Sequence, residues 1–190
     1  MKSYLNLAAV RLCTESEGPG KRFALWVQGC KQRCPDCCNQ QMQEFKKAHI
    51  VEADDLIHLI QKSKGDFDIE GVSFIGGEPL LQAEGLSFVA EWCRKNNLSV
   101  LVFTGFLYET LLKTDDLFVK KLLANTDILV DGLYDKNHPD LERDWVGSKN
   151  QKVVFLSDRY KNGIEYEKKE RSMELLISEK EILSNGWPFI

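Results

Sequence analysis

The sequence predicts an α/β fold, an open and partial (βα) barrel with a mainly parallel sheet. Short apolar runs alternate with helical patterns along most of the chain. Alternating strands and helices favour right-handed crossovers, which place successive strands parallel to one another. Four such strands precede Gly132, where the pattern changes. Four units are too few to close an eight-stranded barrel, so we expect a curved, open sheet.

A strand is expected at each short continuous apolar run. Such runs are typical of strands that are buried on both faces. Gly76, Gly77 and Pro79 end one run, and Gly105 ends another. Apolar residues spaced three and four positions apart predict three amphipathic helices between the runs. The predicted strands are 23–27, 71–75, 99–104 and 127–131, and the predicted helices are 54–64, 86–93 and 115–124.

The last part of the chain has a different pattern. A further strand is expected at residues 151–156, after a polar connection. The charged segment 161–171 predicts a solvated surface connection, and segments 172–178 and 181–184 are typical of a β-hairpin that turns at 179–180. No Gly-, Pro- or Ser-rich linker divides the chain. We therefore expect one domain over residues 1–190, with a core at about 18–156 and a C-terminal extension at about 157–190.

Composition argues against several classes of protein. The chain has 190 residues, of which 43% are hydrophobic, and such a chain buries a sizeable core. The net charge is −4 and the basic residues are scattered, so no nucleic-acid partner is indicated. The N-terminal apolar stretch is shorter than the core of a signal peptide, and no run approaches the ~20 residues of a membrane span. We expect a cytoplasmic protein without a membrane partner.

Four of the six cysteines lie between residues 30 and 38. In a reducing compartment such a group favours metal binding over disulfides. Cys30, Cys34 and Cys37 form C-x3-C-x2-C, whereas structural zinc prefers a second, distant pair of ligands that the three histidines do not supply. Three thiolates instead suit a 4Fe-4S cubane with one iron open for chemistry. For Cys38 we expect a packing or substrate-facing role.

This motif follows the first predicted strand, and there it resembles the signature of radical S-adenosylmethionine (SAM) enzymes. A second match follows the second strand, where Gly76, Gly77, Glu78 and Pro79 are similar to the Gly-Gly-Glu motif of that family. In the family this motif holds the methionine amino group of SAM. The chemistry agrees, because glycines let the backbone approach a ligand and a carboxylate attracts an ammonium group.

The resemblance narrows to the small activating enzymes of anaerobic (class III) ribonucleotide reductase and of other glycyl-radical enzymes. Many radical SAM loops have an aromatic residue beside the last ligand, but here Asp36 and Cys38 flank Cys37, so adenine contacts are expected from elsewhere. The matching elements, in order, are Gly18-Pro-Gly-Lys-Arg22, Pro35 and Asn39 of the cysteine loop, Thr104-Gly105-Phe106, Val130-Asp131-Gly132 and residues 147–151.

The resemblance implies a radical mechanism. A 4Fe-4S cluster on Cys30, Cys34 and Cys37 would donate one electron to SAM, which would break into methionine and a 5′-deoxyadenosyl radical. That radical would take a hydrogen atom from a backbone glycine of a large glycyl-radical protein. The cluster would be reduced by a low-potential donor such as flavodoxin or ferredoxin, and no catalytic residue is expected beyond the cluster. The implied SAM-binding residues are Gly76, Gly77, Glu78, Pro79, Thr104 and Asp131.

For several of these residues a purely structural role is an alternative to a role in the site. Glu78 is also suited to the start of a helix, where the macrodipole favours an acid. Thr104 and Asp131 each have the chemistry to cap the next turn. For Arg22 we favour a structural ion pair over a binding role, and for Cys93 a buried thiol, because it lies on the apolar stripe of its helix. The chain leaves open whether Asn150 and Gln151 bind a ligand or form a turn, and Cys13 has no partner that the sequence identifies.

Two other functions are compatible with the same motifs. In the first, radical SAM chemistry acts on a peptide, a nucleoside or another small molecule. In the second, the chain is a non-catalytic zinc or iron-sulfur binding module, which predicts that SAM does not bind.

Overall fold

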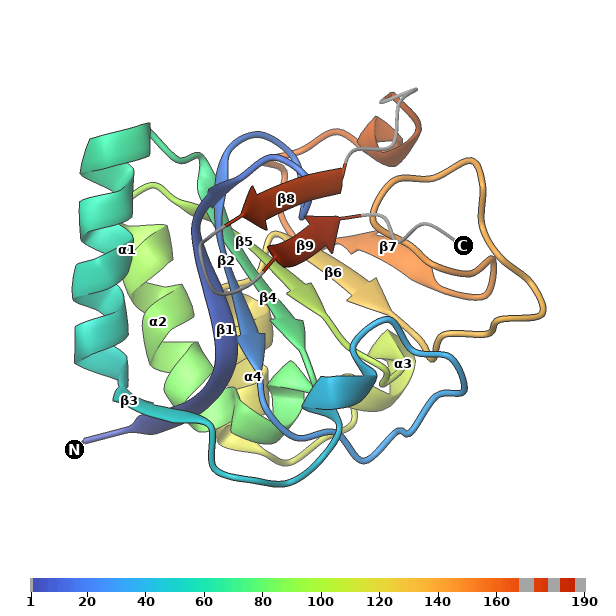
Figure 1. Ribbon diagram of the computed structural model, residues 1–190, viewed down its shortest axis with the longest axis horizontal. Coiled ribbons are helices and arrows are strands. Elements are labelled where there is room, and N and C mark those ends of the chain that lie inside the picture. Colours follow the sequence, from blue (N-terminus) through green and yellow to red (C-terminus); the bar gives the residue numbers. More distant parts are fainter. Residues whose placement is uncertain (1, 168–172, 178–181, 187–190) are drawn as a thin grey trace.

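Figure 1 shows the computed structural model, which describes residues 2–167, 173–177 and 182–186. Seven strands form one twisted sheet in the order β3-β1-β2-β4-β5-β6-β7. The strands are β1 (Tyr4–Thr14), β2 (Arg22–Val27), β3 (His49–Glu52), β4 (Gly71–Gly76), β5 (Ser99–Phe103), β6 (Ile128–Asp131) and β7 (Lys152–Phe155).

The centre of the sheet is parallel. Strands β2, β4, β5 and β6 are the four strands expected from the apolar runs, and they are parallel neighbours. Strands β1, β3 and β7 are added antiparallel at the two sides. Within the described residues the outer strands β3 and β7 do not pair with each other, so the sheet is open. The predicted α/β fold with a mainly parallel, open sheet is confirmed.

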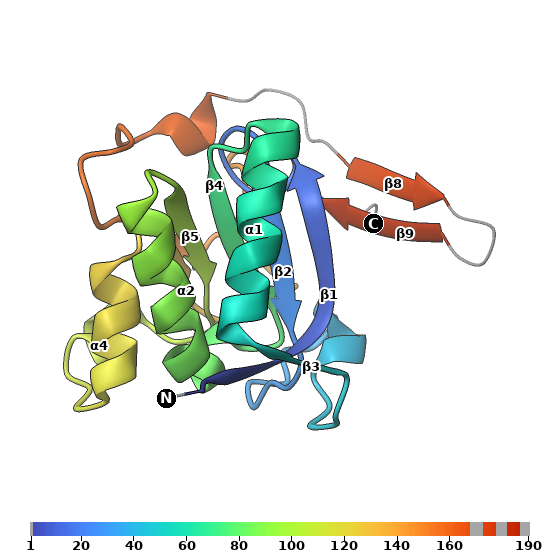
Figure 2. The same ribbon diagram turned by 90° about the vertical axis from the view of Figure 1, so that its left-hand side faces the viewer.

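Helices cover one face of this sheet, as Figure 2 shows for α1, α2 and α4. Helix α4 begins later than expected because the Asp116 carboxylate accepts hydrogen bonds from the N–H groups of Phe118 and Val119, which makes Asp116 the N-cap. The helices are α1 (Ala53–Phe67), α2 (Ala83–Lys95), α3 (Tyr108–Leu111) and α4 (Leu117–Ala124), with short 3-10 turns η1 (Gln40–Met42), η2 (Pro79–Gln82) and η3 (Ile164–Tyr166).

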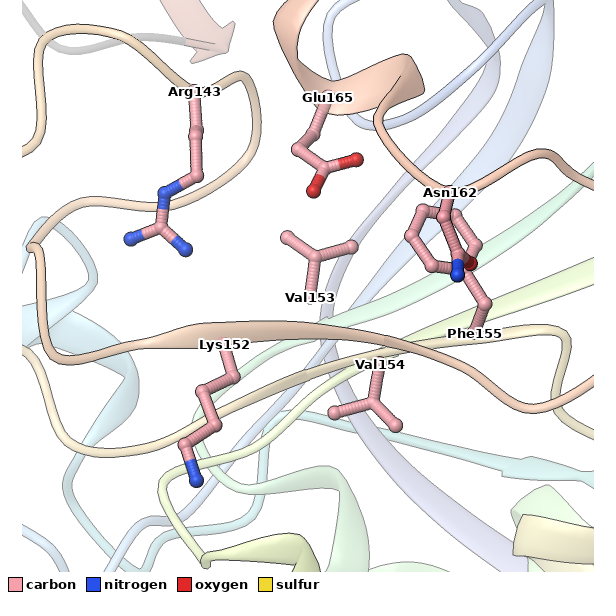
Figure 3. Close-up of a pocket in the computed structure, with 7 residues that line it drawn as sticks. All are labelled: Arg143, Lys152, Val153, Val154, Phe155, Asn162 and Glu165. Atoms are coloured by element: carbon pink, nitrogen blue, oxygen red, sulfur yellow. The ribbon is translucent and has the colours of Figure 1, made fainter.

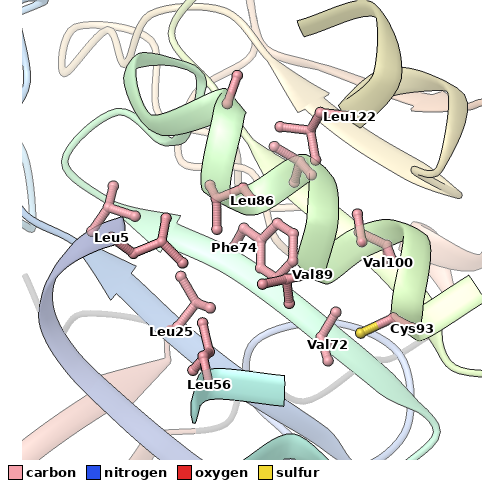
Figure 4. Packing of buried hydrophobic residues seen from close by; sticks show 14 of the residues in the cluster. Leu5, Leu25, Leu56, Val72, Phe74, Leu86, Val89, Cys93, Val100 and Leu122 are labelled. Atoms are coloured by element: carbon pink, nitrogen blue, oxygen red, sulfur yellow. The ribbon is translucent and has the colours of Figure 1, made fainter. Parts of the chain in front are cut away.

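The main core lies between the helices and the sheet (Figure 4). Phe74 of β4 and Val89 of α2 are fully buried there, and burial of such a side chain contributes roughly 1.5–3 kcal/mol. Side chains alternate along a strand, so Trp26 of β2 lies on the opposite face, where it packs with Ile75. Met42 packs against this second cluster. The segment that follows the cysteine loop therefore lies on the face without helices.

Strands β1 and β3 were not predicted. Leu5 and Leu7 of β1 are buried in the core, but the pairing of β1 with β2 shifts register between Leu7 and Ala9. A bulge of this kind interrupts the alternation of apolar and polar residues by which a strand is recognised. Strand β3 has four residues and pairs antiparallel with β1, which is too short a pattern to stand out.

The C-terminal extension contains the expected hairpin. Strand β8 (Met173–Ile177) pairs antiparallel with β9 (Ile182–Gly186), and the predicted turn at 179–180 lies outside the described residues. In the part of the chain that the structure describes, no helix is long and apolar enough to cross a membrane.

Candidate iron-sulfur and cofactor site

The predicted site residues follow the carboxyl ends of the parallel strands. The cysteine loop follows β2, the Gly-Gly-Glu turn starts at the last residue of β4, Thr104 follows β5, and Asp131 ends β6. The carboxyl ends of parallel strands meet at one edge of a sheet, where α/β proteins bind their ligands. The fold therefore brings these segments, far apart in the sequence, to one edge.

The Gly-Gly-Glu turn contacts the start of the cysteine loop directly. The Gly77 N–H donates a hydrogen bond of 2.8 Å to the Val27 carbonyl, and the Glu78 N–H donates one of 2.9 Å to the Gly29 carbonyl. The segment that follows the loop holds its other side, because the Gly29 N–H donates a hydrogen bond of 2.8 Å to the Met42 carbonyl. The loop entrance is thus fixed between two backbone segments.

Both glycines of the turn are required by this close approach. A Cβ atom on Gly76 would lie 2.5 Å from the Val27 nitrogen. The backbone angle φ at Gly76 is +104°, a value that residues other than glycine rarely adopt. A Cβ atom on Gly77 would lie 2.3 Å from the Gly29 carbonyl oxygen. The neighbouring atoms are backbone and have no room to move aside, so no larger residue fits either position.

Glu78 is 1% exposed, and its carboxylate binds protein donors. Oε1 accepts hydrogen bonds from the Thr104 hydroxyl at 2.8 Å and from the Leu80 N–H at 3.0 Å, and Oε2 accepts one from the Gly105 N–H at 2.9 Å. Burial raises the pKa of Glu78, and the three donors oppose that rise. Glu78 also caps η2, as the alternative interpretation expected, and it links β4 to β5 as well.

Thr104 and Asp131 have local partners in addition to their place at the site edge. The Thr104 hydroxyl accepts a hydrogen bond of 3.1 Å from the Phe106 N–H, and Asp131 Oδ2 accepts one of 2.7 Å from the Tyr108 N–H. Thr104 therefore caps the turn that follows it, as expected, whereas Asp131 binds the first N–H of α3, which lies earlier in the chain. Asp131 is fully buried, yet among the described residues its Oδ1 atom has no hydrogen-bond partner. That oxygen is therefore a buried acceptor whose lone pairs are unused in this part of the chain.

The three motif cysteines differ in burial. Cys30 is buried, and Cys34 and Cys37 are half-buried. Backbone N–H groups donate hydrogen bonds to two of the sulfurs. The Gln32 N–H donates to the Cys30 sulfur and the Asn39 N–H to the Cys37 sulfur, each at a distance of 3.4 Å. Such bonds stabilise a thiolate and are among the features that tune an iron-sulfur cluster.

One sulfur contact comes from a distant segment. The pKa of Cys34 is raised by burial, and the backbone N–H of Tyr134 opposes this by donating a hydrogen bond. Nearby, Lys136 and Asp36 form an exposed ion pair of 2.7 Å. The segment after β6 thus touches the cysteine loop at two points, a relationship that no spacing in the sequence signalled.

The donor set fits an iron-sulfur cluster better than a single ion. Within the described residues, no three His, Cys, Asp or Glu side chains converge on a point that would hold one metal ion. A cubane does not require this convergence, since each thiolate binds a separate iron at its own corner. Thiolates are also the ligands that iron-sulfur clusters take. Cys30, Cys34 and Cys37 are the residues that would hold it.

Cys38 is exposed and interacts with its neighbour. Its thiol donates a hydrogen bond to the Cys37 sulfur, which lowers the pKa of Cys37 to about 6 and raises the pKa of Cys38. Cys38 therefore lies beside the predicted ligands without joining the motif, which suits the packing or substrate-facing role expected for it.

Arg22 is fully buried at the opposite end of the sheet, near the amino ends of the strands. Its guanidinium donates to the Ser73 and Ser99 hydroxyls at 2.7 and 2.9 Å and to the Val72 carbonyl at 2.6 Å. Arg22 therefore has the structural role that we favoured over ligand binding. Its partners are hydroxyl and carbonyl oxygens, whereas the expected ion pair requires a carboxylate. Cys93 is fully buried in the core, as predicted.

Asn150 and Gln151 form a turn. Gln151 Oε1 accepts from the Gly147 N–H at 2.8 Å, and its Nε2 donates to the Gly132 carbonyl at 3.1 Å. Asn150 donates to the Leu133 carbonyl at 2.7 Å. Both amides therefore help to hold the segment after β6, which favours the turn-forming role.

A hollow of about 560 Å³ lies beside β7 (Figure 3), and no residue of the cysteine loop lines it. None of the predicted site residues lines it. Its charged side chains already have partners, since Arg143 pairs with Asp140 at 2.8 Å and Lys152 with Glu109 at 2.7 Å. We therefore do not assign the chemistry to this hollow.

The fold and the site edge together define a class, the iron-sulfur proteins whose cysteine loop follows the first strand of a parallel sheet. The chain belongs to the 4Fe-4S single cluster domain family, whose sequence pattern matches residues 16–154.

Three curated relatives describe its place in that family. The anaerobic ribonucleoside-triphosphate reductase-activating protein of Enterobacteria phage T4 is 26% identical, over 81% of this chain and 96% of the relative. The protein of the same name from Vibrio cholerae serotype O1 is 31% identical, over 72% and 88%. The pyruvate formate-lyase 1-activating enzyme of Escherichia coli (strain K12) is 32% identical over 75% of this chain, which spans 56% of that enzyme's length.

Among solved structures, QueE from Escherichia coli is similar over 55% of this chain and 53% of its own, with 17% identity and a TM-score of 0.40. This likeness is too weak to argue from. The resemblance to radical SAM activating enzymes that the motifs predicted is confirmed by the family and the relatives.

Proposed function

We propose that the protein is a radical SAM activating enzyme that installs a glycyl radical on a large partner such as an anaerobic ribonucleotide reductase. The observation that carries this proposal is the pair of backbone hydrogen bonds that joins the Gly-Gly-Glu turn to Val27 and Gly29 at the entrance of the cysteine loop. A ligand bound by the turn would therefore lie next to the loop. The names of the relatives support the kind of partner.

The bound 4Fe-4S cluster would supply the electron that cleaves SAM reductively to methionine and a 5′-deoxyadenosyl radical. The residues of this chain would bind and orient. Cys30, Cys34 and Cys37 hold the cluster, and Gly76 and Gly77 leave room for a ligand to approach the backbone.

Glu78 and Asp131 supply negative charge at the same edge of the sheet. Glu78 would attract the SAM ammonium group, with Pro79 and Thr104 fixing the turn around it. The free Oδ1 atom of Asp131 is a further acceptor for a ligand. The electron would come from a low-potential donor such as flavodoxin or ferredoxin, and the cytoplasmic location stays a prediction.

The test uses anaerobically reconstituted protein, a strong reductant and SAM. Formation of 5′-deoxyadenosine and methionine is expected, and its absence would refute the proposal. Adding a co-encoded large glycyl-radical protein should then give a glycyl radical signal by electron paramagnetic resonance. SAM cleavage without that signal would favour a small-molecule or peptide substrate, and absence of SAM binding at equilibrium would favour a binding module.

A further inference from the structure

Three side-chain amides outside the predicted site meet beside the entrance of the cysteine loop. Asn6 lies on β1, Gln28 follows β2, and Gln82 ends the η2 turn that begins after Glu78. Gln28 is 6% exposed, and the other two are half-buried. Each of the three amides hydrogen bonds to the backbone of another segment, so together they connect four segments of the chain.

Gln82 bridges Asn6 of β1 and Gln28, the residue after β2, whose backbones are also joined by a hydrogen bond of 2.8 Å from the Gln28 N–H to the Asn6 carbonyl. Its Oε1 accepts a hydrogen bond of 2.7 Å from the Asn6 N–H. Its Nε2 donates to the Asn6 carbonyl at 3.0 Å and to the Gln28 carbonyl at 3.1 Å. One side chain thus accepts a bond from β1 and donates two, one to β1 and one to the residue after β2.

Asn6 and Gln28 continue the connection to the segment that follows the cysteine loop. Gln28 Nε2 donates to the Glu44 carbonyl at 2.6 Å, and Asn6 Nδ2 donates to the Lys46 carbonyl at 2.7 Å. The Ala48 N–H donates to Asn6 Oδ1 at 2.9 Å. This segment carries the carbonyl of Met42 that holds the loop entrance, so the amides fix both ends of the loop.

We propose that Gln82 is a positioning residue which, through Asn6 and Gln28, sets the placement of the cysteine loop against the Gly-Gly-Glu turn. An effect of Gln82 on catalysis rests on the proposed function, whereas its hydrogen bonds to Asn6 and Gln28 do not depend on that function. The chemistry makes the residue type essential. A carboxylate at position 82 would keep the acceptor for the Asn6 N–H, and its second oxygen would place negative charge against the Asn6 and Gln28 carbonyls.

The test compares Gln82→Glu with Gln61→Glu in the anaerobically reconstituted full chain. Gln61 is exposed on α1 and undergoes the same chemical change. We expect amide hydrogen exchange in residues 28–30 and 42–48 to become at least about tenfold faster in Gln82→Glu, because both hydrogen bonds donated by Nε2 are lost. Iron release to a chelator should accelerate, and the electron paramagnetic resonance spectrum of the reduced cluster should change. Gln61→Glu should leave all three unchanged.

A second variant guards against general misfolding. Gln82→Met removes the polar groups without adding charge, and it should show the same local increase in exchange with the α1 and α2 amides unaffected. Unchanged exchange in both variants, or an increase spread evenly over the chain, would overturn the proposal. If wild-type protein forms no 5′-deoxyadenosine, the proposed function fails while the exchange result still decides the role of Gln82.

Discussion

The Thr104 hydroxyl donates a hydrogen bond of 2.8 Å to Glu78 Oε1, and this bond joins the carboxyl ends of β4 and β5. The carboxylate that the family resemblance assigns to SAM is therefore also part of the scaffold. The two roles are compatible, because a carboxylate offers about four lone-pair sites and Glu78 uses three of them for protein donors. One site remains for an ammonium group.

Changing Thr104 to Val keeps the shape of the side chain and removes its hydroxyl. We expect the free energy of unfolding to fall by about 1–3 kcal/mol, because a buried Glu78 oxygen and the Phe106 N–H each lose a partner. Urea titration measures this loss. Thr110→Val, at an exposed position of α3, should cost less than about 0.5 kcal/mol. Equal losses in the two variants would contradict a structural role for the Thr104 hydroxyl.

Gly77→Ala tests the contact between the turn and the loop. The new Cβ would lie 2.3 Å from the Gly29 carbonyl oxygen, so the turn must move away from the loop. We expect loss of SAM binding by calorimetry and destabilisation of about 1–3 kcal/mol, as for other overpacked sites.

Gly65→Ala is the matched control for that change. Gly65 lies in α1, and a Cβ there meets nothing within 4 Å. Alanine in a helix should stabilise the protein by about 0.5–1 kcal/mol and leave SAM binding intact. If Gly77→Ala bound SAM as well as this control, the close contact would not matter for the ligand.

The sequence predicted the central sheet because each of its strands is a continuous apolar run that is buried on both faces. It did not predict β1, because the bulge after Leu7 breaks the alternation on which recognition of a half-buried strand depends. The positions of α1, α2 and α4 followed from periodicity, but α1 and α2 extend beyond their predicted bounds, and the cap at Asp116 makes α4 begin later than expected. The four-residue helix α3 was not predicted. The patterns did not show that β1, β3 and β7, which lie outside the alternating strands and helices, pair antiparallel with the sheet.

For the site, the motifs identified the residues but not their connections. Gly76 and Gly77 were expected to let a ligand approach, and the structure adds that they also admit the backbone of the cysteine loop. The contact of Tyr134 with Cys34 and the bonds of Gln82 join residues far apart in the sequence. Such contacts depend on tertiary packing, and no local spacing records them.

The cysteine assignment is tested by iron content. In anaerobically reconstituted Cys34→Ala protein we expect cluster iron to be lost, because a cubane held by two thiolates is not retained. Cys38→Ala should keep its iron, since Cys38 only donates a hydrogen bond to Cys37. Loss of iron in Cys38→Ala with retention in Cys34→Ala would exchange the roles of the two cysteines.

Glu17 gives the fold a pH dependence near neutrality. The Gly186 N–H of the C-terminal hairpin donates a hydrogen bond of 2.7 Å to its carboxylate. Burial raises the pKa of Glu17 from 4.5 to about 7; Glu174 adds to this rise, whereas Asn185 and Arg11 oppose it. Between about pH 4.5 and pH 7, Glu17 is therefore protonated in the folded protein and ionised in the unfolded chain.

A pKa that is higher in the folded state means that stability is greatest below the unfolded value and falls as pH rises through the folded value. We expect the free energy of unfolding of the wild type to fall between about pH 4.5 and pH 7 relative to Glu17→Gln, which keeps the acceptor for Gly186 and cannot ionise. Urea titrations at several pH values measure the difference. Glu167→Gln, at an exposed position, should follow the wild type. A wild type and a Glu17→Gln variant with the same pH profile would mean that Glu17 is ionised beneath the hairpin, with its charge stabilised by Arg11.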